Sequence, residues 1–267
     1  MPIRFAPPCC VGVAMSLVLV LVLVLAGVAL AADIDAFVAG TSRACAGCDL
    51  SGRDLHGHSL KLAELNGATL TNVDFSGASL FRAKLQHASA RGAKFHGADL
   101  NLADAKWADL SGADFSDAYL YESDLASANL SGANLQRARL GRAKLNQTDL
   151  TGAKLTGSDL RGARLAGAKL GGADMRGVTL DGQNLRDMDL HGIDFTLSDM
   201  IEADLTGADL AAAKLAGVDL TDANLHGADL RGADLEGANL TRAILTDAQT
   251  DGAKFDAAIM PDGTRRP

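Results

Sequence analysis

Apolar residues recur at every fifth position along most of this chain. From Leu50 to Leu245, 38 of the 40 positions divisible by five hold Leu, Phe or Met. Two positions before each usually stands a small residue, which is Ala in 27 of the 40 cases, and the residue between the two is most often Asp or Asn. The unit therefore reads Ala-Asp/Asn-Leu-x-Gly. A short period without insertions indicates a repeat architecture.

Neither regular secondary structure accommodates a period of five. On an α-helix, at about 100° per residue, successive Leu positions are displaced by roughly 140° and scatter around the cylinder. On a straight strand, an odd spacing sends successive Leu side chains to opposite faces. Within one unit, however, Ala and Leu are two residues apart and share a face. Each unit is therefore predicted to be a short extended piece followed by a bend.

A right-angled bend after each unit closes a square coil of four units, or 20 residues. Coils stacked at the strand spacing of roughly 4.8 Å pair their backbones, and the Ala and Leu side chains fill the interior. Gly at the second bend position suits a turn with positive φ. Where Arg82, Trp107, Glu122 or Arg142 replaces this Gly, we expect a different turn type.

These residues, in this phase, resemble the pentapeptide-repeat family, whose motif is Ala-Asp/Asn-Leu-x-x. The resemblance covers residues 43–262, and the segment Cys-Ala-Gly-Cys-Asp-Leu-Ser-Gly at 45–52 is similar to the start of exported bacterial members. The resemblance implies an all-β fold, a right-handed quadrilateral β-helix solenoid of about ten to eleven coils over residues 45–262. It implies no single activity, because function depends on sites rather than on the fold.

An apolar segment precedes the repeats. Arg4 is its only charge, residues 11–28 are almost wholly apolar, and Ala29-Leu30-Ala31 forms a small-x-small cleavage signal. We interpret residues 1–31 as a secretory signal peptide, which places the mature chain in the bacterial periplasm or outside the cell, without membrane contact. An uncleaved single N-terminal anchor is the alternative, because 18 apolar residues are just long enough to cross a bilayer.

Two flanking segments complete the domain organisation. Residues 32–44 are predicted to form an N-terminal cap, with a short helix over 33–40 that covers the first coil, since an open end exposes Leu and unpaired backbone. Residues 263–267 are predicted to be a flexible tail.

Cys45 and Cys48 are the only thiols that remain after signal cleavage. Three interpretations apply: a disulfide that fastens the first coil, two small buried side chains, or a metal site with His56 and His58. An oxidising compartment favours the disulfide. His56 falls on an outward or corner position and His58 on an inward one, so the two imidazoles point to opposite sides and no metal site is predicted.

Charge is distributed unevenly along the chain. Residues 33–171 carry 16 Lys/Arg against 15 Asp/Glu, a net charge of +1, whereas residues 172–262 carry 6 against 18, a net charge of −12. Asp189, Asp209 and Asp229 are 20 apart and should stack as an acidic ladder, which is costly unless solvated or paired. The plainer interpretation is that motif Asp residues hydrogen-bond their turns and keep the protein soluble. No basic stripe suggests nucleic-acid binding.

The aromatic residues of the surface cluster in the first half. Trp107, Tyr119 and Tyr121 occupy outward positions, and Phe81 lies two coils from Tyr121 in the same column. Exposed aromatics anchor partners, so these four residues form a candidate patch for an unidentified protein partner. Exposed aromatics that stand singly are also normal on any surface.

One stretch departs from the inward Ala pattern. Five consecutive units carry a larger or polar residue there, namely Val178, Gln183, Met188, Ile193 and Ser198. We expect the stack of coils to widen or kink at this point. An inward Gln also needs a hydrogen-bond partner.

Catalytic motifs find little support in this pattern. The six His residues are dispersed, and the register brings together no Ser-His-Asp group, phosphate-binding loop or zinc site. We therefore predict no enzyme activity and no cofactor.

The expected function is that of an exported structural scaffold or protein–protein interaction module. One alternative, suggested by the family resemblance, is an acidic DNA-mimicking inhibitor of a type II topoisomerase, although such a cytoplasmic target conflicts with export. Another is a membrane-tethered envelope protein. Because family members often pair end to end, the resemblance also implies a homodimer through the C-terminal coil.

Overall fold

The computed structural model describes residues 34–267. The predicted signal peptide or anchor, 1–31, lies outside the described residues. In the described part, no helix is long and apolar enough to cross a membrane. The chain divides into two units at residue 42. In the first, residues 34–38 form a short helix in which Phe37 is buried; that this helix covers the first coil stays a prediction.

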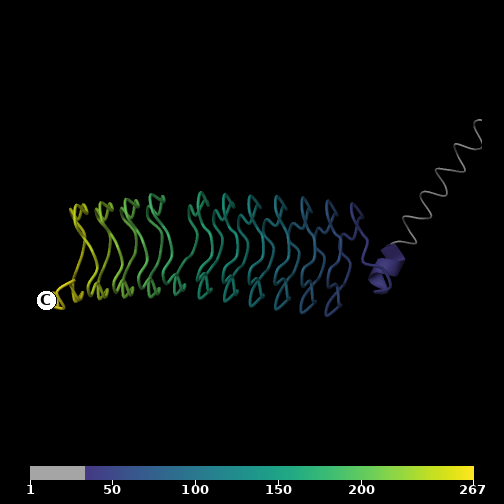
Figure 1. Cartoon of the computed structure of the whole chain (residues 1–267), viewed down its shortest axis with the longest axis horizontal. Helices are drawn as coiled ribbons and strands as arrows, with labels where there is room; N and C mark the ends of the chain where they lie inside the picture. The colour runs from purple at the N-terminus through teal and green to yellow at the C-terminus, as the bar shows by residue number, and fades with distance from the viewer. Residues whose placement is uncertain (1–33) are drawn as a thin grey trace, which may run out of the picture. The chain divides into compact units, whose positions relative to one another are not determined.

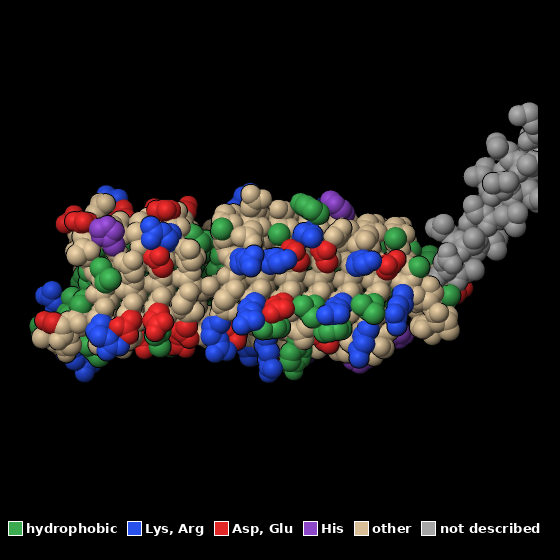
Figure 2. Space-filling model, viewed as in Figure 1, with side chains coloured by type: hydrophobic (Ala, Val, Ile, Leu, Met, Phe, Trp, Pro, Cys, Tyr) green, Lys and Arg blue, Asp and Glu red, His purple; other side chains and the backbone are tan. Residues whose placement is uncertain are grey.

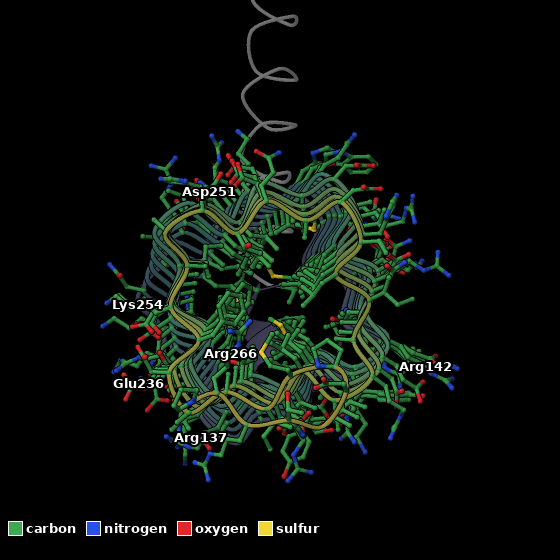
Figure 3. The ribbon with its side chains drawn as sticks, turned by 90° about the vertical axis from the view of Figure 1, so that its left-hand side faces the viewer. Arg137, Arg142, Glu236, Asp251, Lys254 and Arg266 are labelled. Atoms are coloured by element: carbon green, nitrogen blue, oxygen red, sulfur yellow. A yellow bond between two sulfur atoms is a disulfide. The ribbon has the colours of Figure 1, made fainter. Side chains whose placement is uncertain are left out.

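The second unit is a β-helix, as the five-residue period predicts. From Ala44 to Ile259 every fifth residue forms a bridge position, and nearly all pair in parallel with the residue 20 further on, as Asp99 does with Tyr119. The backbone of each extended piece bonds both neighbours: Leu100 N donates to Tyr119 O at 2.8 Å, and Asp99 N donates to Ala78 O at 2.9 Å. Figure 1 shows the successive coils, and the view along the axis in Figure 3 shows their four-sided outline.

The Ala and Leu positions fill the interior. Leu120 and Leu140, one coil apart, are 1% and 0% exposed. Three Phe residues at one inward position stack in successive coils: Phe75 and Phe95 have ring centroids 5.1 Å apart, and Phe95 and Phe115 have centroids 4.6 Å apart. These separations match the strand spacing of roughly 4.8 Å. The side chains therefore stack in register with the backbone.

All corners have the same backbone conformation. The second bend residue has positive φ whether it is Gly112 (64°), Arg82 (56°), Trp107 (57°), Glu122 (54°) or Arg142 (56°). The prediction of a different turn type at the four non-Gly corners is therefore wrong. Each coil must close in register with its neighbours, so a side chain there adopts the left-handed conformation at a cost of roughly 1–2 kcal/mol. Main-chain pairing on both sides offsets this cost.

The motif Asp closes its own turn, as the plainer interpretation expects. Its Oδ1 accepts a hydrogen bond from the N–H two residues later, for example from Ser76 to Asp74 at 2.9 Å. In three turns an Arg at that later position also binds the carboxylate, and Arg161 with Asp159 is one of them. Arg176 and Arg231 donate to Asp174 and Asp229, and these hydrogen bonds lower the pKa of each carboxyl to about 2.

Asp199 departs from this arrangement. The N–H of Ile201, which it would bind, donates instead to Asp181 Oδ1 at 3.2 Å. Asp219 stacks directly on Asp199 in the next coil. Burial raises the pKa of Asp199, and the charges of Asp181 and Asp219 raise it further. Folding therefore disfavours the ionised form of Asp199 relative to the unfolded chain.

The stack is interrupted once among the described residues, between residues 162–173 and 181–194. Bridges are missing at the pairs Arg164/Asn184 and Lys169/Asp189, although the other two sides of the same coils remain bridged. Figure 1 shows the wider separation of the coils there. The expected widening is thus confirmed, and it opens a cavity of about 540 Å³. We call this cavity the lateral slot.

Gln183 spans the interruption from inside. It is 4% exposed, and its Nε2 donates to Leu160 O at 2.9 Å and to Ala163 O at 2.8 Å. The expected need for a partner is therefore met by main-chain carbonyls of the preceding coil.

The C-terminal residues fold back on the last coil. Arg265 forms an antiparallel bridge with Ile259, and Arg266 N donates to Ala258 O at 2.9 Å. This differs from the flexible tail that the sequence predicts for 263–267. The last coil has no following coil to pair with, so its backbone groups bind the tail instead.

The interior packing yields a stability prediction. Ala133→Leu should lower the free energy of unfolding by about 1–3 kcal/mol, because added methyl groups overfill a closed layer. The partly exposed Ser131→Ala should change it by less than about 0.5 kcal/mol. Thermal or denaturant unfolding checks both, and the reverse ranking would contradict the assigned facing.

Asp199→Asn is expected to raise the melting temperature at pH 7, because it removes a charge that burial, Asp181 and Asp219 disfavour. The gain should disappear as the pH falls below about 3.9, where the carboxyl is protonated in the unfolded chain as well.

Asp229→Asn is the matched control, with the opposite sign. Its lowered pKa means that ionised Asp229 stabilises the fold, so the variant should melt lower at pH 7. Its difference from the native protein should shrink as the pH falls from about 4 towards 2. A lower melting temperature for Asp199→Asn at pH 7 would contradict the account of Asp199.

Candidate functional site

The structure joins Cys45 and Cys48 in a disulfide at the start of the β-helix. Their Cα atoms are 5.3 Å apart, and the residues are 4% and 5% exposed. Nδ1 of His58 lies 3.1 Å from His56 O. Over residues 34–267, no group of three or more His, Cys, Asp or Glu side chains is placed to hold a metal ion.

The structure divides the four candidate aromatic residues. Tyr119 and Tyr121 line one hollow, and Phe81 lies two coils away from Tyr121 in the same column. Trp107 occupies a different corner, where its ring stacks on His87 with centroids 5.0 Å apart. The side chains of Tyr119, Tyr121 and Trp107 are all substantially exposed. Only the two Tyr residues therefore form a common surface.

That hollow has a volume of about 540 Å³, and we call it the tyrosine–arginine pocket. The 20-residue register builds it: Arg139 stacks on Tyr119, and Gly141 follows Tyr121 in its column. A Cβ at Gly141 would lie 3.2 Å from Tyr121 Cδ2, so the missing side chain leaves room for the ring. The residues that line the pocket are Asn101, Tyr119, Tyr121, Arg139, Gly141, Arg142, Asp159 and Arg161.

Guanidinium groups lie over both rings. Arg139 Cζ is 4.7 Å from the Tyr119 centroid, and Arg142 Cζ is 5.9 Å from the Tyr121 centroid. Arg161 is held by Asp159 through contacts of 2.9 and 2.6 Å, and these hydrogen bonds lower the pKa of Asp159. Arg139 forms no ion pair with any described residue. Asp159 follows Arg139 in the same column, and the charge of Arg139 helps to lower the pKa of Asp159, but the Asp159 carboxylate is hydrogen-bonded by Arg161. The Arg139 guanidinium, placed on an aromatic face, keeps donors for a second carboxylate.

The positive surface continues around the corner. A second hollow, of about 600 Å³, shares Arg142 with the pocket and is also lined by Lys144 and Arg164. Arg142 pairs with Glu122 at 3.4 Å and Lys144 pairs with Asp124 at 2.9 Å. Sequence analysis did not assign the basic residues to a site. The 20-residue register could have found the pocket, because it places Arg139 next to Tyr119 and Gly141 next to Tyr121.

The acidic ladder also forms. Asp189, Asp209 and Asp229 are bridged in sequence. Each accepts a hydrogen bond from a turn N–H, at 3.2, 2.9 and 3.0 Å respectively. Arg231 binds Asp229 as well, so the ladder is partly neutralised. On the face in Figure 2, Lys and Arg form rows over the N-terminal half, and acidic side chains are more frequent towards the C-terminal end.

Comparisons with known proteins agree with this architecture. The family described as pentapeptide repeats matches overlapping stretches that run from residue 45 to residue 260. A search of curated proteins gives no match.

Three solved structures are similar. HetL, a pentapeptide repeat protein involved in heterocyst differentiation regulation from the cyanobacterium Nostoc sp. strain PCC 7120, is 30% identical over 87% of this chain and 97% of its own, with a TM-score of 0.26. Rfr23 from the cyanobacterium Cyanothece 51142 is 24% identical over 54% of this chain and 93% of its own, with a TM-score of 0.24. QnrB1, a plasmid-mediated fluoroquinolone resistance protein, is 16% identical over 78% of this chain and 89% of its own, with a TM-score of 0.48. On the family match, which spans nearly all of the β-helix, the chain belongs to the pentapeptide-repeat family.

Proposed function

We propose that this protein is an exported, non-enzymatic scaffold that binds a protein partner through the tyrosine–arginine pocket. The observation that carries the proposal is the exposed Arg139 guanidinium over Tyr119, without an ion-pair partner among the described residues. Tyr and Arg are the residue types that contribute most often to binding hot spots. A carboxylate of the partner would bind Arg139, and an apolar or aromatic group beside it would lie on the Tyr rings.

Rigidity supports the same role. Paired backbones hold the pocket residues, so they need little reordering when a partner binds. In the adjoining hollow, Arg142 and Lys144 are paired with Glu122 and Asp124, so Arg164 supplies the charge there that favours an acidic partner.

Export rests on the N-terminal apolar segment, and a disulfide at the first coil suits an oxidising compartment. A chain that keeps its N-terminal segment would be a membrane-tethered envelope protein with the same binding surface. The acidic ladder lends less support to DNA mimicry, because its Asp residues bind turn N–H groups and Arg231.

Affinity capture from envelope extract should test the pocket. Arg139→Glu reverses the charge that meets the partner, and Tyr119→Ala with Tyr121→Ala removes both rings. Each is expected to reduce the specifically captured protein by about tenfold or more. Trp107→Ala, an exposed aromatic on another corner, is the matched control and should leave capture unchanged. Equal loss with all variants, or with none, would contradict the pocket as the binding surface.

Mass spectrometry of the native N-terminus should find a chain that begins near Ala32, because the small-x-small motif directs cleavage there. A chain that begins at Met1 in the membrane fraction would support the tethered form. A chain that begins at Met1 in the soluble cytoplasm would contradict export, and inhibition in a topoisomerase supercoiling assay would then favour the acidic inhibitor.

A further inference from the structure

We propose that the lateral slot binds an extended peptide segment of a partner protein, which adds a strand to the interrupted stack. This binding site is separate from the tyrosine–arginine pocket and does not depend on it. Three features of the slot support it: the unpaired backbone of its two lips, residues 164–170 and 184–189, the two side chains that keep the lips apart, and the apolar floor.

The lips carry backbone groups that are paired everywhere else in the neighbouring coils. One coil earlier, Leu145 N donates to Arg164 O and Leu150 N donates to Lys169 O, both at 2.8 Å. The equivalent groups at the slot are the N–H groups of Leu165 and Leu170 and the carbonyls of Asn184 and Asp189. None has a hydrogen-bond partner in the described part of the chain.

The hydrogen bonds that the later coil normally donates to the earlier coil are also missing at the slot. In the next coil, Asp204 N donates to Gln183 O at 2.8 Å and Asp209 N donates to Met188 O at 3.0 Å. At the slot, Asn184 N and Asp189 N make no such bond within the described residues. Two facing rows of unpaired donors and acceptors, at strand intervals, are the template for an added strand. A compact small molecule could satisfy only a few of them.

The protein's own sequence keeps the slot open. The carboxamide of Gln183 donates to Ala163 O, which is the acceptor that Asn184 N would otherwise use. Met188 stands where the coils on either side have Ala168 and Ala208. These two larger side chains lie at the interruption, whereas coils with Ala at both positions pair normally. The slot is therefore built by residues 183 and 188.

The floor and rim fit a strand with alternating side chains. The floor contains Ala168, which is half-buried at the opening, and Met188, which is 8% exposed. Both side chains are apolar, and that of Met188 is flexible. The rim carries both charges, from Arg164 and Asp187 among others. Because side chains of a strand alternate, a small apolar residue would face Ala168 and Met188 while polar neighbours face the rim. A volume of about 540 Å³ accommodates a short segment of this kind.

The probe is a peptide with fluorescein on its N-terminal amine and an amidated C-terminus, with the sequence of residues 128–135, Ala-Asn-Leu-Ser-Gly-Ala-Asn-Leu. It has the alternation of a coil piece and no charged side chain. Fluorescence anisotropy with the full mature chain should show saturable binding of one peptide. Hydrogen exchange should slow at the amides of Leu165, Leu170, Asn184 and Asp189 when the peptide is added.

The double variant Gln183→Ala, Met188→Ala restores Ala at both positions and should let the coils pair directly. Peptide affinity should fall by about tenfold or more, because the unpaired backbone groups are lost. The variant leaves both ends of the β-helix unchanged, so the loss separates slot binding from binding at an open end. Val218→Ala, a similar change at an intact layer, is the matched control and should bind like the native protein.

Ala168→Phe provides a second variant, because it fills the slot from its floor and leaves Gln183 in place. It should also weaken peptide binding by about tenfold. If the double variant fails to fold, this variant alone tests whether the peptide binds in the slot. A peptide methylated on its backbone nitrogens should bind similarly weakly, because it cannot donate hydrogen bonds to the carbonyls of Asn184 and Asp189.

Three results would overturn the proposal. The first is an anisotropy that does not saturate. The second is equal affinity for the native protein and for a folded slot-filling variant, which would place the peptide elsewhere. The third is unchanged exchange at the slot amides under saturating peptide, which would mean that water alone occupies the slot.

Discussion

The structure depends on one constraint: each coil must use 20 residues so that its backbone groups meet those of the next coil. A parallel bridge every five residues leaves no freedom to absorb an insertion. The same constraint imposes the left-handed conformation at every corner, including Trp107 and Arg142, where a side chain disfavours it. Main-chain pairing therefore outweighs local preference, and the many weak interactions act together.

Register also determines what the surface presents. Residues 20 apart stack, so a column repeats or varies a chemical group at the strand spacing. Tyr121 next to Gly141 forms part of a pocket, whereas Asp199 next to Asp219 produces repulsion. The outer surface can carry such different columns because the interior needs only the Ala and Leu positions. This separation of packing from display suits a family without a common activity.

Sequence periodicity predicted the β-helix, the inward Leu column and the widening near Gln183, because these follow from spacing and side-chain size. It did not predict the corner conformation at Arg82 or Glu122, since propensity describes single residues and closure is a property of the whole coil. The contact between Arg139 and Tyr119 could be predicted from the sequence, because the 20-residue register places the two side by side. The sequence does not predict which two sides of the coil lose their pairing, because that depends on the hydrogen bonds that Gln183 donates to Leu160 O and Ala163 O.

The interruption has a mechanical consequence for the β-helix itself. On either side of the interruption, successive coils are bridged on all four faces, whereas the two coils at the interruption are bridged on only two faces. The elastic resistance to bending and torsion is therefore lowest at that level, and it is lower about one axis than about the other. The β-helix is therefore expected to bend most easily at this level, so a load applied across it would concentrate strain there and begin unravelling from the middle rather than from the tips.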